Sequence, residues 1–223
     1  MLSNILPQFG EDLMVVGGYC TEDQPIVARV FLPLDLVTSS GTHFQSWSTA
    51  SSLAGVELTS TTRWRDLHQL VGRRGNSIGK TQFAAMPAGQ LNRLVAVLSS
   101  VAPRPERVGY ALWAVYAGEL DEKLMQATSL IGPDAPGFLK AGSFYKYVDD
   151  LGWAASRSLE DGMHLPVAIW DASFNFVLAS PLYHDSFYLT CSDDVFQRLR
   201  EMGIELIVAD RDAVLASEEV WQQ

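Results

Sequence analysis

The clearest pattern of apolar and polar positions in this chain is a helical period that lies between two prolines. Pro87 suits the first turn of a helix, where its missing amide hydrogen is not needed, and Pro103 ends the pattern. A helix with one apolar face must cover that face, so this helix is predicted to pack against a sheet. The apolar face consists of Leu91, Leu94, Val95, Leu98 and Val101.

Short apolar runs bounded by turn residues predict strands on both sides of this helix. The run from Val108 to Tyr116 is apolar on both faces and predicts a central strand. Ser192, followed by Asp193 and Asp194, predicts a helix start, because acidic residues are favourable at the positive end of the helix dipole. Further strands are predicted at 13–16, 25–32, 143–148, 167–170, 176–179, 186–190 and 204–208, and further helices at 44–54, after Thr62 and from Asp210 to Trp221.

The order of these elements indicates the fold class. Strands and helices come in blocks rather than in strict alternation, which favours an α+β fold with a mainly antiparallel sheet packed against several helices. A chain of 223 residues is predicted to form a single compact domain over 1–223. The two prolines of the segment at 103–107 mark a candidate subdomain boundary, since they stiffen a short connector.

Charge and composition narrow the classes of partner. The formal net charge of −10 disfavours binding to phosphate backbones and to anionic membranes, so nucleic acid is not an expected partner. With 48% apolar residues the chain has enough material for a buried core. No apolar run approaches the roughly 18 residues of a membrane span. Two sparse cysteines and an N-terminus without the features of a signal peptide predict a soluble cytoplasmic protein.

One segment of the sequence resembles a known binding site, and the histidines and cysteines can be compared with known metal-binding and catalytic spacings. The segment from Gly75 to Thr81 resembles a phosphate-binding loop, but it has three residues between its glycines where that loop needs four. Nucleotide binding by the basic loop at 72–81 therefore stays a minor alternative. The four histidines lie in no metal-binding spacing, and Cys191 has no histidine at a recognisable spacing. We expect no metal, no cofactor and no recognisable catalytic constellation.

Aromatic residues on neighbouring predicted strands are the remaining candidates for a site. Most of them belong to the core, but a sheet lined with aromatic rings can also bind a peptide or a small molecule. His184 and Asp185 are an adjacent acid–base pair, although neighbours on a strand point to opposite faces. The candidate ligand- or partner-binding residues are Trp113, Tyr116, Trp170, Asp171, Tyr183, His184 and Asp185.

Three segments also carry a family likeness. Trp170 to Ala179 aligns without a gap with the pattern W-P-x-D-R-x-W-x-V-A, in a degenerate form. Trp113 to Gly118 is similar to a W-x-G-Y-G strand end, and Pro87 to Val101 is similar to a proline-led leucine helix. In these respects the chain resembles an uncharacterised family of actinobacterial cytosolic proteins, and the resemblance implies no activity. Ser173 and Phe174 stand where that family often has Asp-Arg, so a site built on that pair would be absent here.

These observations favour a non-enzymatic binding or protein-interaction module, similar in role to an immunity or regulatory protein. Its partner would be another protein or a small ligand. The alternative is an enzyme with a dispersed site around Asp171, His184 and Asp185.

Overall fold

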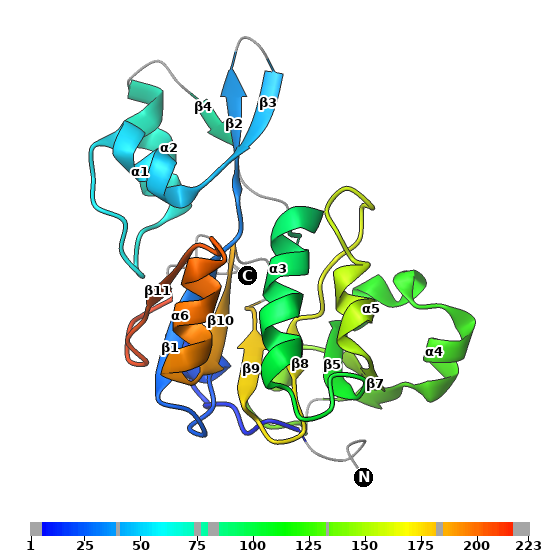
Figure 1. The fold of residues 1–223 in the computed structure, drawn as a ribbon. Helices are drawn as coiled ribbons and strands as arrows, with labels where there is room; N and C mark the ends of the chain where they lie inside the picture. Colours follow the sequence, from blue (N-terminus) through cyan, green and yellow to red (C-terminus); the bar gives the residue numbers. More distant parts are fainter. Residues whose placement is uncertain are drawn as a thin grey trace.

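A computed structural model shows how these segments assemble. It describes residues 6–38, 41–73, 77–79, 85–132, 134–181 and 185–215. Within these residues the fold is α+β, as the order of elements predicted, with two separate sheets and several helices. Figure 1 shows a large main body and a smaller part that projects from one end of it.

The main body is built on one eight-stranded sheet, and all of its neighbouring strands pair antiparallel. Across the sheet the order is β11 (Leu206–Val208), β1 (Ile26–Phe31), β10 (Ser186–Cys191), β9 (Phe176–Ala179), β8 (Ala168–Trp170), β5 (Val108–Trp113), β7 (Phe144–Asp149) and β6 (Ser129–Ile131). Strand β1 pairs with β10 and β11, so segments that are far apart in the sequence meet at one side of the sheet.

Helices cover one face of this sheet. Helices α3 (Ala88–Val101), α5 (Leu151–Ala155) and α6 (Asp193–Glu201) lie side by side on it, with α3 between the other two (Figure 1). The predicted apolar stripe of α3 is buried there, apart from its half-buried last member Val101, and it belongs to the same core as Val30 and Leu189 of the sheet. The prediction that this helix packs on a sheet is therefore confirmed.

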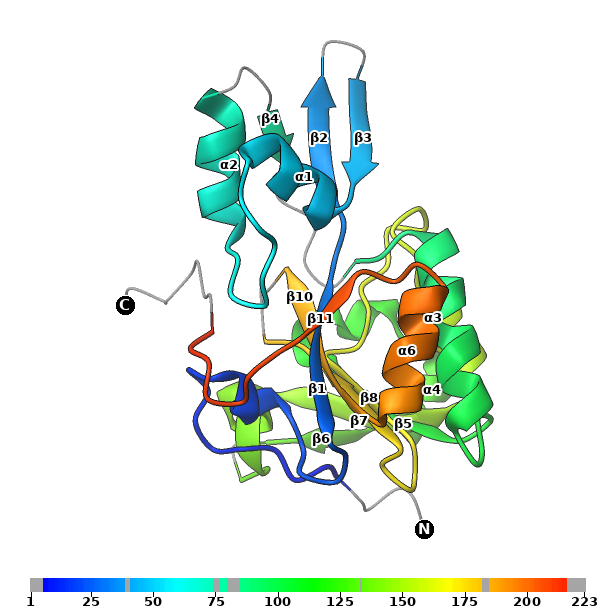
Figure 2. The ribbon, with the colours of Figure 1, turned by 60° about the vertical axis from the view of Figure 1, so that its left-hand side comes forward.

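The other face of the sheet is covered by irregular chain. Figure 2 shows the N-terminal segment on the side away from α3 and α6. This segment includes the 3-10 helix η2 (Val16–Tyr19), and a second 3-10 helix, η4 (Gly137–Ala141), packs beside it. A separate core forms here, in which the ring of Phe138 contacts the rings of Phe9 and Tyr19. The sheet is thus buried on both faces. The remaining elements of the main body are η3 (Ala114–Glu119) and α4 (Glu122–Ala127).

Residues 34–79 form what we call the small unit. It contains a three-stranded sheet in the order β3 (Gly41–Gln45), β2 (Leu34–Thr38), β4 (Ser77–Gly79), and two helices, α1 (Trp47–Ala54) and α2 (Trp64–Arg73). Its own core centres on Trp47. The connector at 103–107, the candidate boundary of the sequence, joins α3 to β5 inside the main body instead.

Several local predictions are confirmed. Helix α1 buries Trp47 together with Ala50, Ser51 and Ala54, and it ends at Gly55, whose φ of 69° is left-handed. The side chain of Ser192 accepts a hydrogen bond from the amide of Val195 and so caps α6. These features depend on residues within one turn of each other, which is why the sequence alone reveals them.

Other predictions are wrong at the ends of elements. Residues 13–15 form a turn and a single bridge, between Val15 and Val214, and Val16 already begins η2, so the predicted strand at 13–16 does not form. The strand that begins at Val108 stops at Trp113, where the chain turns into η3. Phe44 lies in β3 and not in the following helix. Residues 210–215 form turns rather than the start of a helix, and the remainder of that predicted helix lies outside the described residues.

Candidate functional site

Two of the nominated aromatic residues lie together at the end of β5. The rings of Trp113 and Tyr116 make an edge contact with centroids 5.5 Å apart, and both side chains are half-buried. Tyr116 also stacks on the imidazole of His164, with ring centroids 3.8 Å apart. This pair is therefore partly accessible, and through His164 it contacts a cluster of charged residues.

The charged cluster is centred on the carboxylate of Glu119. One oxygen lies 2.7 Å from Nδ1 of His164, and the other accepts from the backbone amide of His164 and from the guanidinium of Arg157. Arg157 is buried, stacks on Trp153 and donates from Nε to the carbonyl of His164. Each of the three bonds to Glu119 joins η3 to the 157–164 segment. The cluster thus fastens two segments of the chain to each other.

The nominated pair Trp170 and Asp171 is structural. Trp170 is 1% exposed and packs so closely over Gly109 that a Cβ at that position would come within 2.2 Å of the indole. The buried carboxylate of Asp171 accepts hydrogen bonds from the amides of Ser173 and Phe176 and from the side chain of Asn175. Its role is to hold the turn between β8 and β9.

Asp185 lies at the other end of these strands. It precedes β10 beside the end of β9, whereas Asp171 holds the start of β9. Its Oδ1 is 2.9 Å from Nη2 of the fully buried Arg29, and Ser186 donates to the same oxygen. Tyr183 and His184 lie outside the described residues. The two nominated carboxylates are therefore not brought together.

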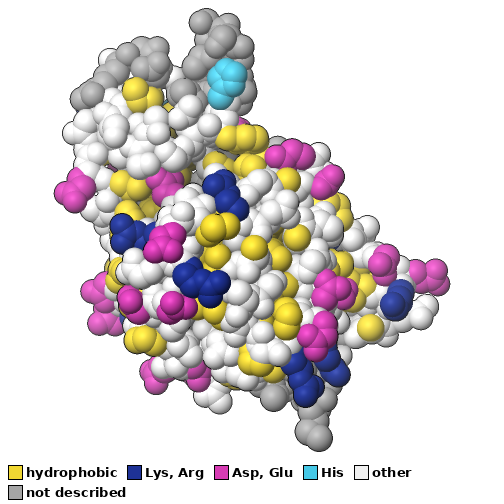
Figure 3. Space-filling model, in the orientation of Figure 1, with side chains coloured by type: hydrophobic (Ala, Val, Ile, Leu, Met, Phe, Trp, Pro, Cys, Tyr) yellow, Lys and Arg dark blue, Asp and Glu magenta, His cyan; other side chains and the backbone are white. Residues whose placement is uncertain are grey.

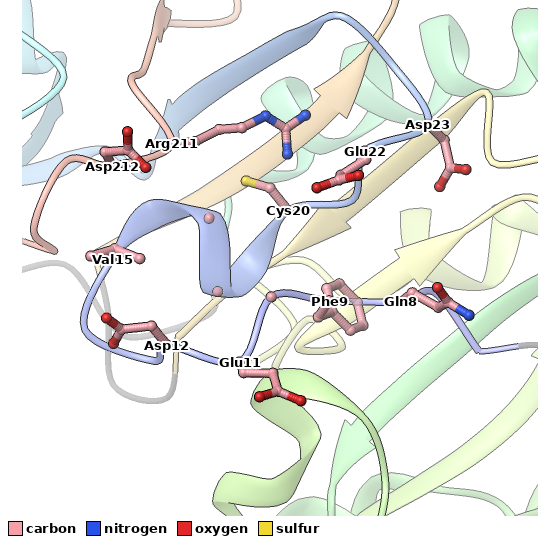
Figure 4. A pocket seen from close by; sticks show the side chains of 13 residues that line it. Gln8, Phe9, Glu11, Asp12, Val15, Cys20, Glu22, Asp23, Arg211 and Asp212 are labelled. Atoms are coloured by element: carbon pink, nitrogen blue, oxygen red, sulfur yellow. The ribbon is translucent and has the colours of Figure 1, made fainter.

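A different place offers a cavity. A pocket of about 640 Å³ opens on the face of the main body that carries the N-terminal segment (Figure 4). Three stretches of chain form it: the N-terminal segment up to η2, the extended stretch before β1, and the turn after β11. Its lining residues are Gln8, Phe9, Gly10, Glu11, Asp12, Val15, Gly17, Gly18, Cys20, Glu22, Asp23, Arg211 and Asp212.

Close backbone contacts build the walls of this pocket. A Cβ at Gly18 would lie 2.2 Å from the carbonyl oxygen of Asp12, and one at Gly10 would lie 2.5 Å from that of Gly17. Only glycine permits backbones to approach so closely. The amide of Gly17 also donates to the carbonyl of Arg211, which ties the turn after β11 to the N-terminal segment.

The pocket concentrates negative charge. Five carboxylates line it and face one guanidinium, that of Arg211. Asp12 accepts a hydrogen bond from the amide of Met14. Within the described part of the chain the other four carboxylates, those of Glu11, Glu22, Asp23 and Asp212, have no hydrogen-bond or ion-pair partner. On the helical face, by contrast, lysine and arginine side chains are interspersed among the acidic ones (Figure 3).

The floor of the pocket carries a cysteine. Cys20 is 2% exposed, and Arg211 extends toward it and toward Glu22 in the close-up of Figure 4. Burial raises the pKa of the Cys20 thiol to about 12, against the smaller opposing effects of Thr190 and Arg211. A thiol with such a pKa is a weak nucleophile at neutral pH. Cys191 lies in the core under the helices, so the two free thiols are on opposite faces of the sheet.

We expect the protein to lose stability at alkaline pH. Burial raises the pKa of Cys20, Cys191 and Tyr19 to about 12 from ordinary values of 9.0, 9.0 and 10.0. These groups ionise more easily in the unfolded chain, so their contribution is complete below pH 9 and is lost as the pH rises from 9 to 12. Thermal unfolding measured from pH 8 to 11.5 should show a steadily falling Tm. Replacing both cysteines with alanine should shrink the early part of the decline, and a constant Tm up to pH 11.5 would contradict the expectation.

The sequence did not reveal this pocket. Its acids are spread over positions 11–23 and 212, and each reads as an ordinary surface residue in a turn. The signals available were Gly17-Gly18 and Gly10, because glycines beside a predicted strand indicate close backbone approach. Nothing in the sequence showed that the turn after β11 would close the pocket.

No three or more histidine, cysteine, aspartate or glutamate side chains in the described ranges are grouped so as to hold a metal ion, and no described helix is long and apolar enough to cross a membrane. No family model, no curated protein and no solved structure matches the chain. The resemblance to the actinobacterial family therefore stays a sequence-based prediction.

Proposed function

We propose that this protein is a non-enzymatic interaction module that binds a positively charged segment of a partner protein in the acidic pocket. The observation that carries the proposal is the ratio of five carboxylates to one guanidinium around a cavity of about 640 Å³. Four of those carboxylates have no partner within the described residues. Complementary charge both attracts such a partner from a distance and selects against acidic ones.

The shape of the pocket supports a side chain as the occupant. A lysine or arginine has a long apolar stem with a charged end, and the pocket combines the ring of Phe9 and the side chain of Val15 with carboxylates. An arginine would also match carboxylates in a two-pronged geometry. We place this role in the cytoplasm, a reducing compartment in which two buried free thiols stay reduced.

Neutralising the pocket is expected to weaken binding of a cationic peptide. The probe is an acetylated peptide in which arginines alternate with glycines, titrated by calorimetry at about 50 mM salt, where exposed charges are only partly screened. In the triple variant Glu22→Gln, Asp23→Asn, Asp212→Asn the Kd should rise between about threefold and about 150-fold, because each exposed charge pair contributes about 0.2–1 kcal/mol.

A matched control separates the pocket from the overall charge. The variant Glu106→Gln, Glu122→Gln, Glu201→Gln removes the same charge from exposed positions outside the pocket. It should leave the Kd within about twofold, because these charges lie outside the pocket and act on a bound peptide only through solvent, where the screening length at 50 mM salt is about 14 Å. Equal weakening by both triple variants would show unspecific attraction and would overturn the proposed function.

A further inference from the structure

The small unit meets the main body through polar bonds that run to its backbone. Arg29, in β1 of the main body, donates from Nη1 to the carbonyls of Ser60 and Thr62 at 2.9 and 2.7 Å. Glu205, between α6 and β11, accepts from the amides of Trp47 and Ser48, both at 2.7 Å. Because these four bonds go to backbone atoms, they fix the position of the small unit independently of the identity of its side chains.

The charged groups of Arg29 and Glu205 would still be paired or hydrated if the small unit moved away from the main body. Arg29 keeps Asp185 at 2.9 Å and the hydroxyl of Ser186 at 2.8 Å, and both belong to the main body. The ring of Phe31, on the same strand, also stays beneath its guanidinium. Glu205 is half-buried and would become hydrated. Separation therefore leaves no buried charge without a partner, which keeps its free-energy cost low.

The apolar contact between the two parts is small. The core of the small unit is made mainly of its own residues, and among the described residues only Phe31 and Ile207 join it from the main body. One more hydrogen bond crosses the junction, from Nε1 of Trp47 to the carbonyl of Leu32. Parts of a chain joined by a small and polar contact are expected to move relative to each other.

We propose that the small unit is an arm that separates from the main body while staying folded, and that Arg29 and Glu205 act as the latch that holds it docked. The hinge on the outgoing chain is the Leu32-Pro33 step between β1 and β2. The arm keeps its three-stranded sheet and its two helices when it swings. The inference does not depend on the acidic pocket.

Distances between spin labels test the latch. One label is placed at Gln69→Cys on α2 and the other at Gln126→Cys on α4, both exposed, while the buried Cys20 and Cys191 stay unlabelled. In the variant Glu205→Ala two charge-assisted bonds are lost, so the undocked population should rise about tenfold or more. The distance distribution should gain a second, separate population, and far-UV circular dichroism should stay unchanged.

Further variants keep the test independent of misfolding. Trp47→Phe removes one crossing hydrogen bond and keeps the aromatic ring, so it should shift the distribution in the same direction. Glu201→Ala, a nearby exposed acid, should not shift it. A label pair within the main body, at Gln126 and Asp194, should keep one distance throughout. The latch is refuted if the Gln69 distances stay unchanged in both variants, if the main-body pair broadens equally, or if helix content falls.

Discussion

Replacing Arg29 with methionine is expected to lower the free energy of unfolding by about 3–5 kcal/mol, the range for breaking a buried ion pair on one side. Arg29 is 0% exposed, and its guanidinium satisfies Asp185, the hydroxyl of Ser186 and two backbone carbonyls at once. Methionine fills most of the volume but donates no hydrogen bond. The carboxylate of Asp185 would then remain in the interior without its countercharge. Urea unfolding followed by tryptophan fluorescence measures the loss.

Two control variants test whether the loss of stability comes from the buried ion pair. Arg198→Met removes an exposed arginine whose partner, Asp194, lies 3.8 Å away one helical turn earlier. That change should cost no more than about 0.5 kcal/mol, because surface pairs contribute little. The double variant Arg29→Met, Asp185→Asn should recover part of the loss, since it no longer buries an unpaired charge. A loss below about 1 kcal/mol in the single variant would contradict the central role of Arg29.

Asp171→Ala is the second large effect that we expect, with a loss of about 2–4 kcal/mol of stability. The carboxylate accepts three hydrogen bonds, and one of them comes from the buried amide of Phe176. It also holds a turn in which Phe174 adopts a φ of 52°, a left-handed conformation that costs about 1–2 kcal/mol for a residue with a side chain. Thermal unfolding compares the variant with the unmodified protein.

A matched pair of substitutions separates this structural role from a general charge effect. Asp171→Asn keeps the shape and one accepting oxygen, so it should cost clearly less than Asp171→Ala. Asp194→Ala removes an exposed carboxylate and should change stability by less than about 0.5 kcal/mol. If alanine and asparagine at position 171 had equal and small effects, the carboxylate would not be the support of the turn.

Asp171 and Asp185 also show why residues nominated together from the sequence can lie far apart in the fold. They are separated by 14 positions, and both precede short apolar runs, so they look equivalent in the sequence. One strand, β9, lies between them and carries the chain across the sheet, and this places them at opposite ends of it. Each then finds a partner of its own, a turn in one case and Arg29 in the other. Strand direction, which no local pattern encodes, decides the outcome.

Whether a predicted element is confirmed depends on how far apart in the sequence the residues that form it lie. Helix α3, strand β9 and the cap at Ser192 depend on residues that are close in sequence, and the structure confirms them. The ends of other elements depend on distant contacts. Val15 meets Val214, so the stretch predicted as a strand makes only one bridge.

The acidic pocket is the clearest case of a site that local reasoning misses. The carbonyl of Arg211 accepts from the amide of Gly17 across nearly the whole length of the chain. Without that contact, Glu22 and Asp212 would not line the same pocket. Their grouping is a product of the fold, and the glycines at 10 and 18 make it sterically possible.

By itself the sequence determined the α+β class, the apolar faces of the helices, the helix caps and the absence of a familiar catalytic motif. Hydrophobic periodicity and capping act over a few residues, and a single sequence displays them directly. Only the tertiary structure decided that residues 34–79 form a small unit, that Arg29 and Glu205 hold it, and that five carboxylates share one pocket. Those features arise from pairings between residues far apart in the chain, whose geometry is set by the packing of the whole sheet.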